Sequence, residues 1–182
     1  MVMLEFIQYS NAACKKSVAI PFDMKANDSK CVYVIEDLDA ELKALGLNRS
    51  NILIRLYSHL TQPSSTSEAQ KEEKGWEIVS DIQSIENVYF PCSLELVKEL
   101  KDPKLEVEIR MDEQNKLLSH ITVTCMNVGL YVWLESDVEG YFSRNGCVMY
   151  PMKPLQLTFK AREKALETAS QLQIRSYYDT FY

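Results

Sequence analysis

The sequence has few of the residues on which most catalytic and cofactor-binding motifs depend. Its 182 residues include only two histidines, His59 and His120, and only five glycines. These counts exclude a glycine-rich phosphate loop and leave little histidine for a catalytic triad or a zinc site. No close pair with the spacing of a zinc site occurs among the five cysteines, which are Cys14, Cys31, Cys92, Cys125 and Cys147. We therefore predict no catalytic residue, no cofactor and no metal ligand in this chain.

Basic patches and long apolar runs are missing as well. The net charge is −6, and the one dense charge run, 71–74 (KEEK), is of mixed sign, which argues against a nucleic-acid partner. No run approaches the roughly 18 apolar residues of a membrane span. The N-terminus is apolar but lacks a basic segment and carries Glu5, so we do not interpret it as a signal peptide. Either the protein is cytoplasmic and free-standing, or it is a fragment whose signal lies upstream.

What the sequence does contain is apolar residues at every second position. In 104–111 the residues Leu105, Val107, Ile109 and Met111 alternate with charged ones, which is typical of a half-buried strand. Residues 130–134 (LYVWL) are apolar throughout and predict a central strand covered on both faces. The other predicted strands are 2–9, 17–22, 31–35, 51–58, 76–79, 87–90, 121–125, 155–160 and 171–175. Many short strands and little helix predict an all-β sandwich architecture.

Two short helices and one domain boundary complete the prediction. Residues 36–45 begin with acidic side chains and end at Gly46, whereas 93–100 open on a capping serine and end near Pro103. A polar, serine-rich segment at 62–74 predicts a loop at a hairpin tip. Because proline follows the second helix and a fresh alternating strand then begins, we place the boundary at Asp102-Pro103, giving domains 1–101 and 102–182.

Several residues were weighed for chemistry. The carboxylate pairs Glu135 with Asp137 and Asp112 with Glu113 could serve a glycosidase, but turn formation explains them fully. His120 lies within a strand and His59 follows one, so we expect a structural or surface role for both. The two tryptophans, Trp76 and Trp133, could stack on sugars. For Trp133, inside the apolar strand, a place in the core is the better prediction.

The end of the chain and two sequons suggest contacts beyond one domain. Four aromatic residues occur among the last six, namely Tyr177, Tyr178, Phe181 and Tyr182. Such a tail would be a large exposed apolar patch, so we expect it to dock on its own sandwich or on another domain. Asn27 and Asn48 begin Asn-x-Ser sequons in polar segments and are candidate N-glycosylation sites.

The last 80 residues carry a motif that resembles the final domain of animal β-mannosidases. In that family Val-Trp-Leu-Asp is followed by a short loop, Gly-Arg-Phe-Ser-Asp-Asn-Gly-Phe and a methionine. The corresponding residues here are Trp133, Gly140, Phe142, Ser143, Asn145, Gly146 and Met149. Residues 176–182 (SYYDTFY) are similar to the family's C-terminal Ser-Leu-(Thr/Ser)-Asp-Ile-Tyr. Residues 87–90 resemble its Asn-Tyr-His-Phe. Arg144 and Cys147 depart from the pattern, replacing an acidic and an aromatic residue.

This resemblance implies a specific origin for the chain. Members of the family are lysosomal glycoside hydrolases that remove terminal β-D-mannose from N-glycan-derived oligosaccharides, with both catalytic carboxylates in a central (β/α)₈ barrel. The chain has no Asn-Glu dipeptide and no barrel-like alternation of strands and helices. The resemblance therefore covers only the region after the barrel, as two immunoglobulin-like β-sandwich domains. The abrupt start in a strand leaves open that the first domain lacks its opening strands.

Three functional readings follow from these observations. The first is an accessory region that packs on the catalytic barrel, with the aromatic tail as an anchor. The second is a free-standing module that binds an oligosaccharide or a protein, and aromatic residues aligned on one open sheet face would favour it. The third is a truncated product without an independent role. Cys14 and Cys31 match two family cysteines at similar spacing, from which we also predict a disulfide worth about 3 kcal/mol.

Overall fold

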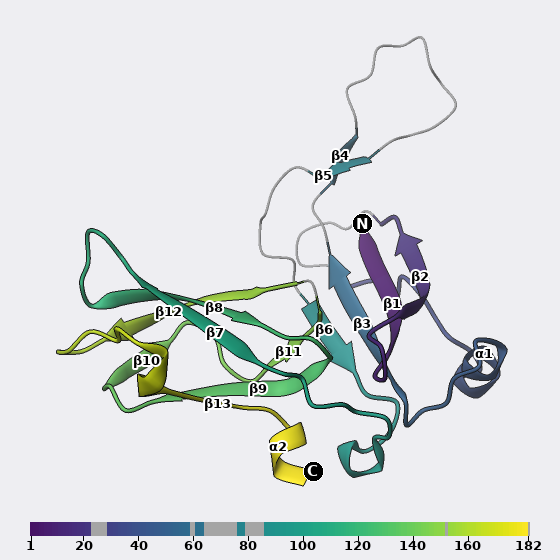
Figure 1. The fold of residues 1–182 in the computed structure, drawn as a ribbon. Coiled ribbons are helices and arrows are strands. Elements are labelled where there is room, and N and C mark those ends of the chain that lie inside the picture. Colours follow the sequence, from purple (N-terminus) through teal and green to yellow (C-terminus); the bar gives the residue numbers. More distant parts are fainter. Residues whose placement is uncertain (23–28, 59–60, 64–75, 79–85, 152, 182) are drawn as a thin grey trace. The chain divides into compact units, whose positions relative to one another are not determined.

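The computed structural model describes residues 1–22, 29–58, 61–63, 76–78, 86–151 and 153–181 (Figure 1). The chain folds as two compact units. The first comprises Met1–Gln8 and Cys14–Val97, and the second comprises Tyr9–Ala13 and Lys98–Tyr182. Antiparallel strands dominate both units and helices are few and short, which confirms the all-β prediction. The predicted domain boundary at Asp102-Pro103 stays a prediction.

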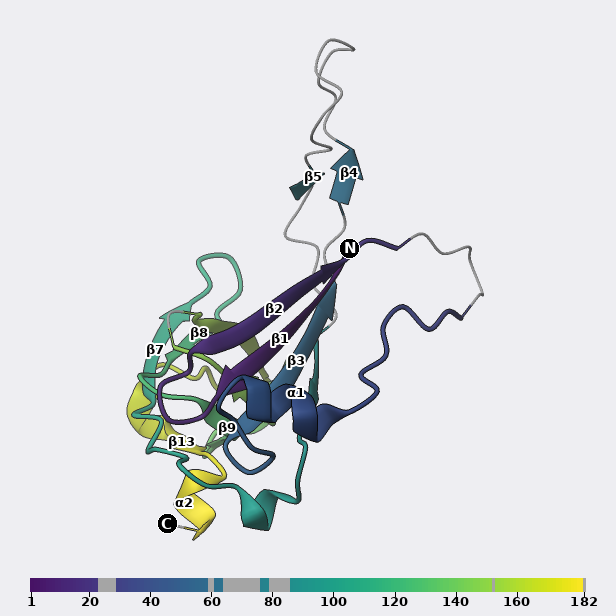
Figure 2. The ribbon, with the colours of Figure 1, turned by 90° about the vertical axis from the view of Figure 1, so that its right-hand side faces the viewer.

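A four-stranded antiparallel sheet forms the first unit, with its three longer strands side by side in Figure 2. Its strand order is β2 (Cys14–Ile20), β1 (Val2–Gln8), β3 (Ile52–Ser58) and β6 (Glu86–Tyr89). The short strands β4 (Thr61–Pro63) and β5 (Trp76–Ile78) pair separately. Across β1 and β3, Leu4 faces Leu56 and Phe6 faces Ile54, so even-numbered residues of both strands share one face.

Helix α1 (Leu38–Ala44) covers part of that face, at the place where the sequence predicts a helix. Asp37 caps its N-terminus, with the carboxylate Oδ1 accepting the Ala40 N–H at 3.0 Å. Gly46, at φ +69°, ends the helix, and the Leu47 N–H donates to the Leu42 carbonyl at 2.8 Å. This closure buries Leu42 and Leu47 against the sheet core, whose members also include Leu4, Phe6, Ile20, Ile52 and Ile54.

The second unit is a sandwich of two antiparallel sheets, seen as two layers in Figure 1. One sheet has the order β10 (Gly140–Phe142), β12 (Leu155–Ala161), β8 (Leu118–Thr124) and β7 (Glu106–Met111). The other has the order β11 (Cys147–Met149), β9 (Gly129–Ser136) and β13 (Leu172–Arg175). Inward side chains of both sheets form one core, made of Ile121, Val123, Val132, Leu134, Met149, Leu157, Phe159, Ala161 and Leu166. The short helix α2 (Tyr178–Phe181) follows β13.

Two local predictions are wrong, and two short strands were not predicted. Residues 93–100 form only a 3₁₀ turn at Leu94–Leu96, because Ser93 makes no side-chain cap and Val97 is already extended. No strand forms at 31–35, an irregular segment whose apolar residues Val32 and Ile35 pack instead on the first sheet's core. The strands β10 and β11, each of three residues, were not predicted, since runs this short show no reliable period.

Candidate functional site

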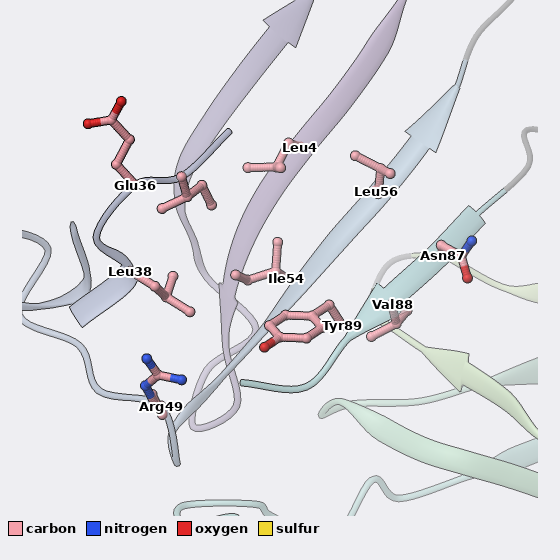
Figure 3. A pocket seen from close by; sticks show the side chains of 10 residues that line it. Leu4, Glu36, Leu38, Arg49, Ile54, Leu56, Asn87, Val88 and Tyr89 are labelled. Atoms are coloured by element: carbon pink, nitrogen blue, oxygen red, sulfur yellow. The ribbon is translucent and has the colours of Figure 1, made fainter. Parts of the chain in front are cut away.

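A groove in the first unit lies on the part of the sheet face next to α1. It has a volume of about 590 Å³. Leu4, Ile54 and Leu56 project toward it from β1 and β3, and Leu38 and Arg49 close one side (Figure 3). Ile35, Glu36, Asn87, Val88 and Tyr89 complete the lining. Leu4, Ile54 and Leu56 lie on the same face of the sheet as the core, and they line a groove beside α1 and the segment before it.

The size and lining of this groove suit the binding of a small molecule. Its volume is within the range of small-molecule sites, and its lining is mostly apolar with a polar rim. Arg49 at the rim donates to both carboxylate oxygens of Asp39, at 2.7 and 3.0 Å. This pairing raises the pKa of Arg49 and lowers that of Asp39. Among the described residues that line the groove there is no histidine and no cysteine.

A charged cluster lies on the opposite face of the same sheet. The Arg55 guanidinium, with a side chain only 11% exposed, donates to Glu5 at 3.2 Å and to Glu86 at 3.0 Å. It also stacks over the Tyr57 ring, and the Tyr57 hydroxyl donates to Glu5 at 2.8 Å. Burial, then the Glu5 hydrogen bond, raises the pKa of Tyr57 to about 12. Because the arginine holds both carboxylates, this cluster joins three strands and is a structural network.

The predicted disulfide between Cys14 and Cys31 does not form. All five cysteines are free thiols, and these two are exposed. Each sulfur turns to the backbone of its own segment: Cys14 Sγ donates to the Lys16 carbonyl at 3.3 Å and Cys31 Sγ to the Tyr33 carbonyl at 3.6 Å. A disulfide requires both Cβ atoms to face each other, which similar spacing in sequence does not ensure. Burial raises the pKa of the Cys14 thiol and raises that of Cys125 to about 11, which makes these two thiols poor nucleophiles.

The motif residues of the second unit join its two sheets. On the β12 side, the Phe142 ring packs on Phe159 with centroids 4.8 Å apart, and Ser143 exchanges two hydrogen bonds with Thr158, of 2.8 and 2.9 Å. Gly140 lies so close to β12 that an added Cβ would be 2.5 Å from the Lys160 carbonyl oxygen. These contacts fasten the start of the motif to the four-stranded sheet.

The end of the motif contacts the other sheet. The Asn145 side-chain amide accepts the Leu134 N–H and donates to the Leu134 carbonyl, both at 2.8 Å. It therefore pairs with β9 as a strand residue would. Gly146 follows at φ +65°, a left-handed conformation that favours glycine, and Met149 enters the core at 2% exposure. The motif is thus a structural connection, and every one of these contacts holds the sandwich together.

The outer face of β9 corrects the prediction for the apolar strand. β9 is central in its sheet, as predicted, but only one face of it is covered. Val132 and Leu134 are buried, whereas Trp133 is 49% and Tyr131 44% exposed. Across β13, Arg175 is the cross-strand partner of Trp133 and Gln173 that of Glu135, and all of these are exposed as well. We call this surface, formed by Tyr131, Trp133, Glu135, Gln173 and Arg175, the Trp133 face.

A backbone hydrogen bond attaches the aromatic tail to its own sandwich. The Tyr177 N–H donates to the Leu130 carbonyl at 2.8 Å, and the Asp179 carboxylate accepts from both the N–H and the hydroxyl of Ser176. These bonds begin the short helix α2. The Phe181 ring stacks on Tyr177 with centroids 4.5 Å apart but is 60% exposed. The described part of the tail therefore still presents an aromatic ring to solvent.

The remaining candidates lie at turns and strand ends. Asp112 caps the β7–β8 turn by accepting the N–H groups of Gln114 and Asn115, and its second oxygen is 3.0 Å from His120 Nε2. The His120 hydrogen bond, then these N–H groups, lowers the pKa of Asp112. Glu113, Glu135 and Asp137 are exposed. His59, Asn27, Tyr182 and most of the predicted loop at 62–74 lie outside the described residues, as does the side chain of Trp76.

The described residues contain neither a metal-binding cluster nor a membrane-spanning helix. No cluster of three or more histidine, cysteine, aspartate or glutamate side chains is placed to hold a metal ion among them. Within the same part of the chain, no helix is long and apolar enough to cross a bilayer. The Trp133 face and the groove of the first unit are therefore the surfaces that we consider for binding.

Comparison with known proteins identifies the type of the second unit. Residues 100–180 match the family Ig_mannosidase, described as an Ig-fold domain. The crystal structure of a β-D-mannosidase from Dictyoglomus thermophilum is similar, with a TM-score of 0.58 and 14% sequence identity. That alignment covers 97% of this chain and 18% of the other, so the chain spans less than a fifth of that protein. Among curated proteins no match was found. The second unit is an Ig-fold domain of the mannosidase type, and the likeness over the whole chain is one of fold.

Proposed function

We propose that this chain is a non-catalytic C-terminal accessory region of a β-mannosidase-like glycoside hydrolase, which packs on the catalytic barrel and stabilises it. The observation that carries the proposal is the extent of the structural match, in which almost all of this chain aligns with a small part of a β-D-mannosidase. The described side chains agree with an accessory role. Their motif residues hold the sandwich together, and Arg55 pairs with both carboxylates of its network, Glu5 and Glu86.

The parent activity belongs to the same proposal. By the sequence resemblance it is hydrolysis of terminal β-D-mannose from N-glycan-derived oligosaccharides, in the lysosome. The sequons at Asn27 and Asn48 support a route through the secretory pathway, and Asn48 is exposed in a turn where its side-chain oxygen accepts from Ser50. A lysosomal location is tested by whether an antiserum raised against this chain labels lysosomes in fixed cells.

The tail provides the anchor in this proposal. Phe181 stacks on Tyr177, whose backbone is bonded to β9, so the exposed ring has a fixed position from which it can pack on a neighbouring domain. Tyr141 on β10 is a matched control, since it is 58% exposed against 60% for Phe181. Phe181→Ser should lower the melting temperature of the longer enzyme by more than that of the 182-residue chain, where it removes only the stacking on Tyr177. Tyr141→Ser should change neither. Equal effects of the two substitutions would argue against the anchor.

The main proposal is tested on the protein made by its own cells. An antiserum against the chain is used to isolate the native product, and its intact mass and peptides are measured. We expect a product well above 21.0 kDa with peptides from a barrel domain upstream. A native product of about 21.0 kDa, unassociated with any other polypeptide, would contradict the proposal. In parallel, the purified chain should not hydrolyse a chromogenic β-mannoside at acidic pH, and Glu135 and Asp137 would be the first residues to substitute if it did.

A second function, binding of an oligosaccharide by a sandwich module, is favoured by one observation. Trp133 and Tyr131 are two residues apart on one strand and both are exposed on the same sheet face. Exposed aromatic rings on one strand are better suited to stacking on a sugar ligand than to packing in the core. This second function does not exclude the first, because an accessory domain can also carry a binding surface.

A further inference from the structure

The ring of Trp133 is held in place from one side. Asn145 fixes the segment beside β9, and Gly146 comes next, so that a Cβ added at Gly146 would lie 3.7 Å from both Cε3 and Cζ3 of the indole. The glycine thus places bare backbone against the indole. The side chain is nevertheless 49% exposed. The indole therefore packs on backbone while much of its surface is open to solvent, which is the arrangement of a stacking platform.

Tyr131 extends the platform through an irregularity of the strand. It has φ +50°, a left-handed conformation that is uncommon for a residue other than glycine. It lies in a bulge between β9 and β11. Cys147 pairs with Val132 and Met149 pairs with Gly129, so three steps along β9 correspond to only two along β11. Bulges re-aim side chains and occur often next to functional sites. Leu130 and Val132 are buried at this bulge, whereas Tyr131, two residues before Trp133 in β9, is 44% exposed.

The polar residues of the Trp133 face balance in charge and in hydrogen-bonding capacity. Arg175, the cross-strand partner of Trp133, donates to the Gln173 side-chain oxygen at 3.0 Å. This hydrogen bond turns the amide nitrogen of Gln173 away from Arg175. Glu135, opposite Gln173, adds an acceptor. One carboxylate and one guanidinium sum to zero charge, so the face suits neither an anion nor a nucleic acid. Sugar hydroxyl groups both donate and accept, and a neutral pyranose also has an apolar ring face.

We propose that the Trp133 face binds a neutral pyranose of an oligosaccharide, with the sugar ring stacked on Trp133 and its hydroxyl groups bonded to Glu135, Gln173 and Arg175. The inference rests on the second function proposed above and names its site and ligand class. Tyr131 provides an adjacent surface for the next sugar residue. A single open platform covers only one side of a sugar, so we expect a dissociation constant of roughly 1 mM.

The experiment titrates the ¹⁵N-labelled 182-residue chain with β-1,4-mannobiose and β-1,4-mannotriose and follows its indole N–H resonances by NMR. We expect one indole resonance and the backbone of β9 and β13 to shift, with tighter binding of the trisaccharide. Trp133→Ala should weaken binding at least tenfold, Trp133→Phe less, and Tyr141→Ala, an exposed aromatic residue of the other sheet, not at all. Backbone spectra and thermal melts of each variant establish that it is folded.

The outcomes separate this proposal from the others. Cellobiose binding with the same dependence on Trp133 supports a general pyranose platform. Absence of shifts with every disaccharide and trisaccharide at about 20 mM would overturn the proposal, as would binding that Trp133→Ala leaves unchanged. Shifts confined to the first unit would also overturn it. The accessory role is read from the native mass instead, so either proposal can fail while the other holds.

Discussion

The side chain of Asn145 allows a quantitative test of how the sandwich is held together. Its amide forms hydrogen bonds with both the N–H and the carbonyl of Leu134, each of 2.8 Å, in a partly buried setting. Asn145→Ala removes both partners at once. An unsatisfied buried polar group costs about 1–3 kcal/mol, and because water reaches part of this segment we take the lower half of the range for each. The expected loss in the free energy of unfolding is about 2–4 kcal/mol.

Such a loss is large for a unit of this size. For domains of 60–100 residues, each kcal/mol lowers the melting temperature by about 4–8 °C, so Asn145→Ala should lower it by roughly 8–32 °C. The measurement is urea unfolding followed by circular dichroism, with differential scanning calorimetry to assign the transition to the second unit. The slope of the urea dependence should stay unchanged, because the substitution alters stability rather than the surface exposed on unfolding.

A matched control exists in the β7–β8 turn. Asn115 makes one exposed side-chain hydrogen bond, to the Leu117 N–H at 3.1 Å. Asn115→Ala removes the same chemical group but should cost less than about 1 kcal/mol, because water replaces an exposed partner. If both substitutions destabilise equally, or if Asn145→Ala costs less than about 1 kcal/mol, the amide does not act as a strand residue and the reasoning is refuted.

Three other predictions test separate parts of the structure. Gly140→Ala should lower the free energy of unfolding of the second unit by about 1–3 kcal/mol in urea, because its Cβ would lie 2.5 Å from a β12 carbonyl oxygen. A Cβ added at Gly46 has no atom within 4 Å, so Gly46→Ala is strained only by its backbone conformation. The pKa of Tyr57 is about 12 in the folded state and about 10 in the unfolded state. The resulting contribution to the free energy of unfolding is fully present below about pH 10 and is lost as the pH rises from about 10 to 12. The free energy of unfolding should fall less steeply over this range in Tyr57→Phe. A protein secreted by a eukaryotic host should lose mass on enzymatic deglycosylation, and Asn48→Gln should reduce that loss; an identical loss would remove this sequon from consideration.

The sequence by itself indicated the antiparallel strands of both units and most of their elements, although it predicted a sandwich where the first unit has one four-stranded sheet partly covered by α1. Alternation such as that of residues 104–111 identified β7, since a strand with one buried face has a period of two. Asp37 and Gly46 bounded α1 because capping depends on local side-chain and backbone chemistry. The resemblance in residues 131–149 pointed to an Ig-fold domain of the mannosidase type, and the family match over 100–180 agrees.

Only the tertiary structure decided which faces are covered and which side chains meet. The run 130–134 is apolar at every position, so its sequence could not reveal that Trp133 and Tyr131 are exposed: that depends on a bulge with β11 and on the polar residues of β13. Cys14 and Cys31 had a spacing compatible with a disulfide, but the backbone turns each thiol to its own carbonyl. The role of Asn145 could not be predicted either, because its partner Leu134 is eleven residues away, on β9. Periodicity and helix capping depend on neighbouring residues, whereas burial and strand pairing depend on segments that are distant in the chain.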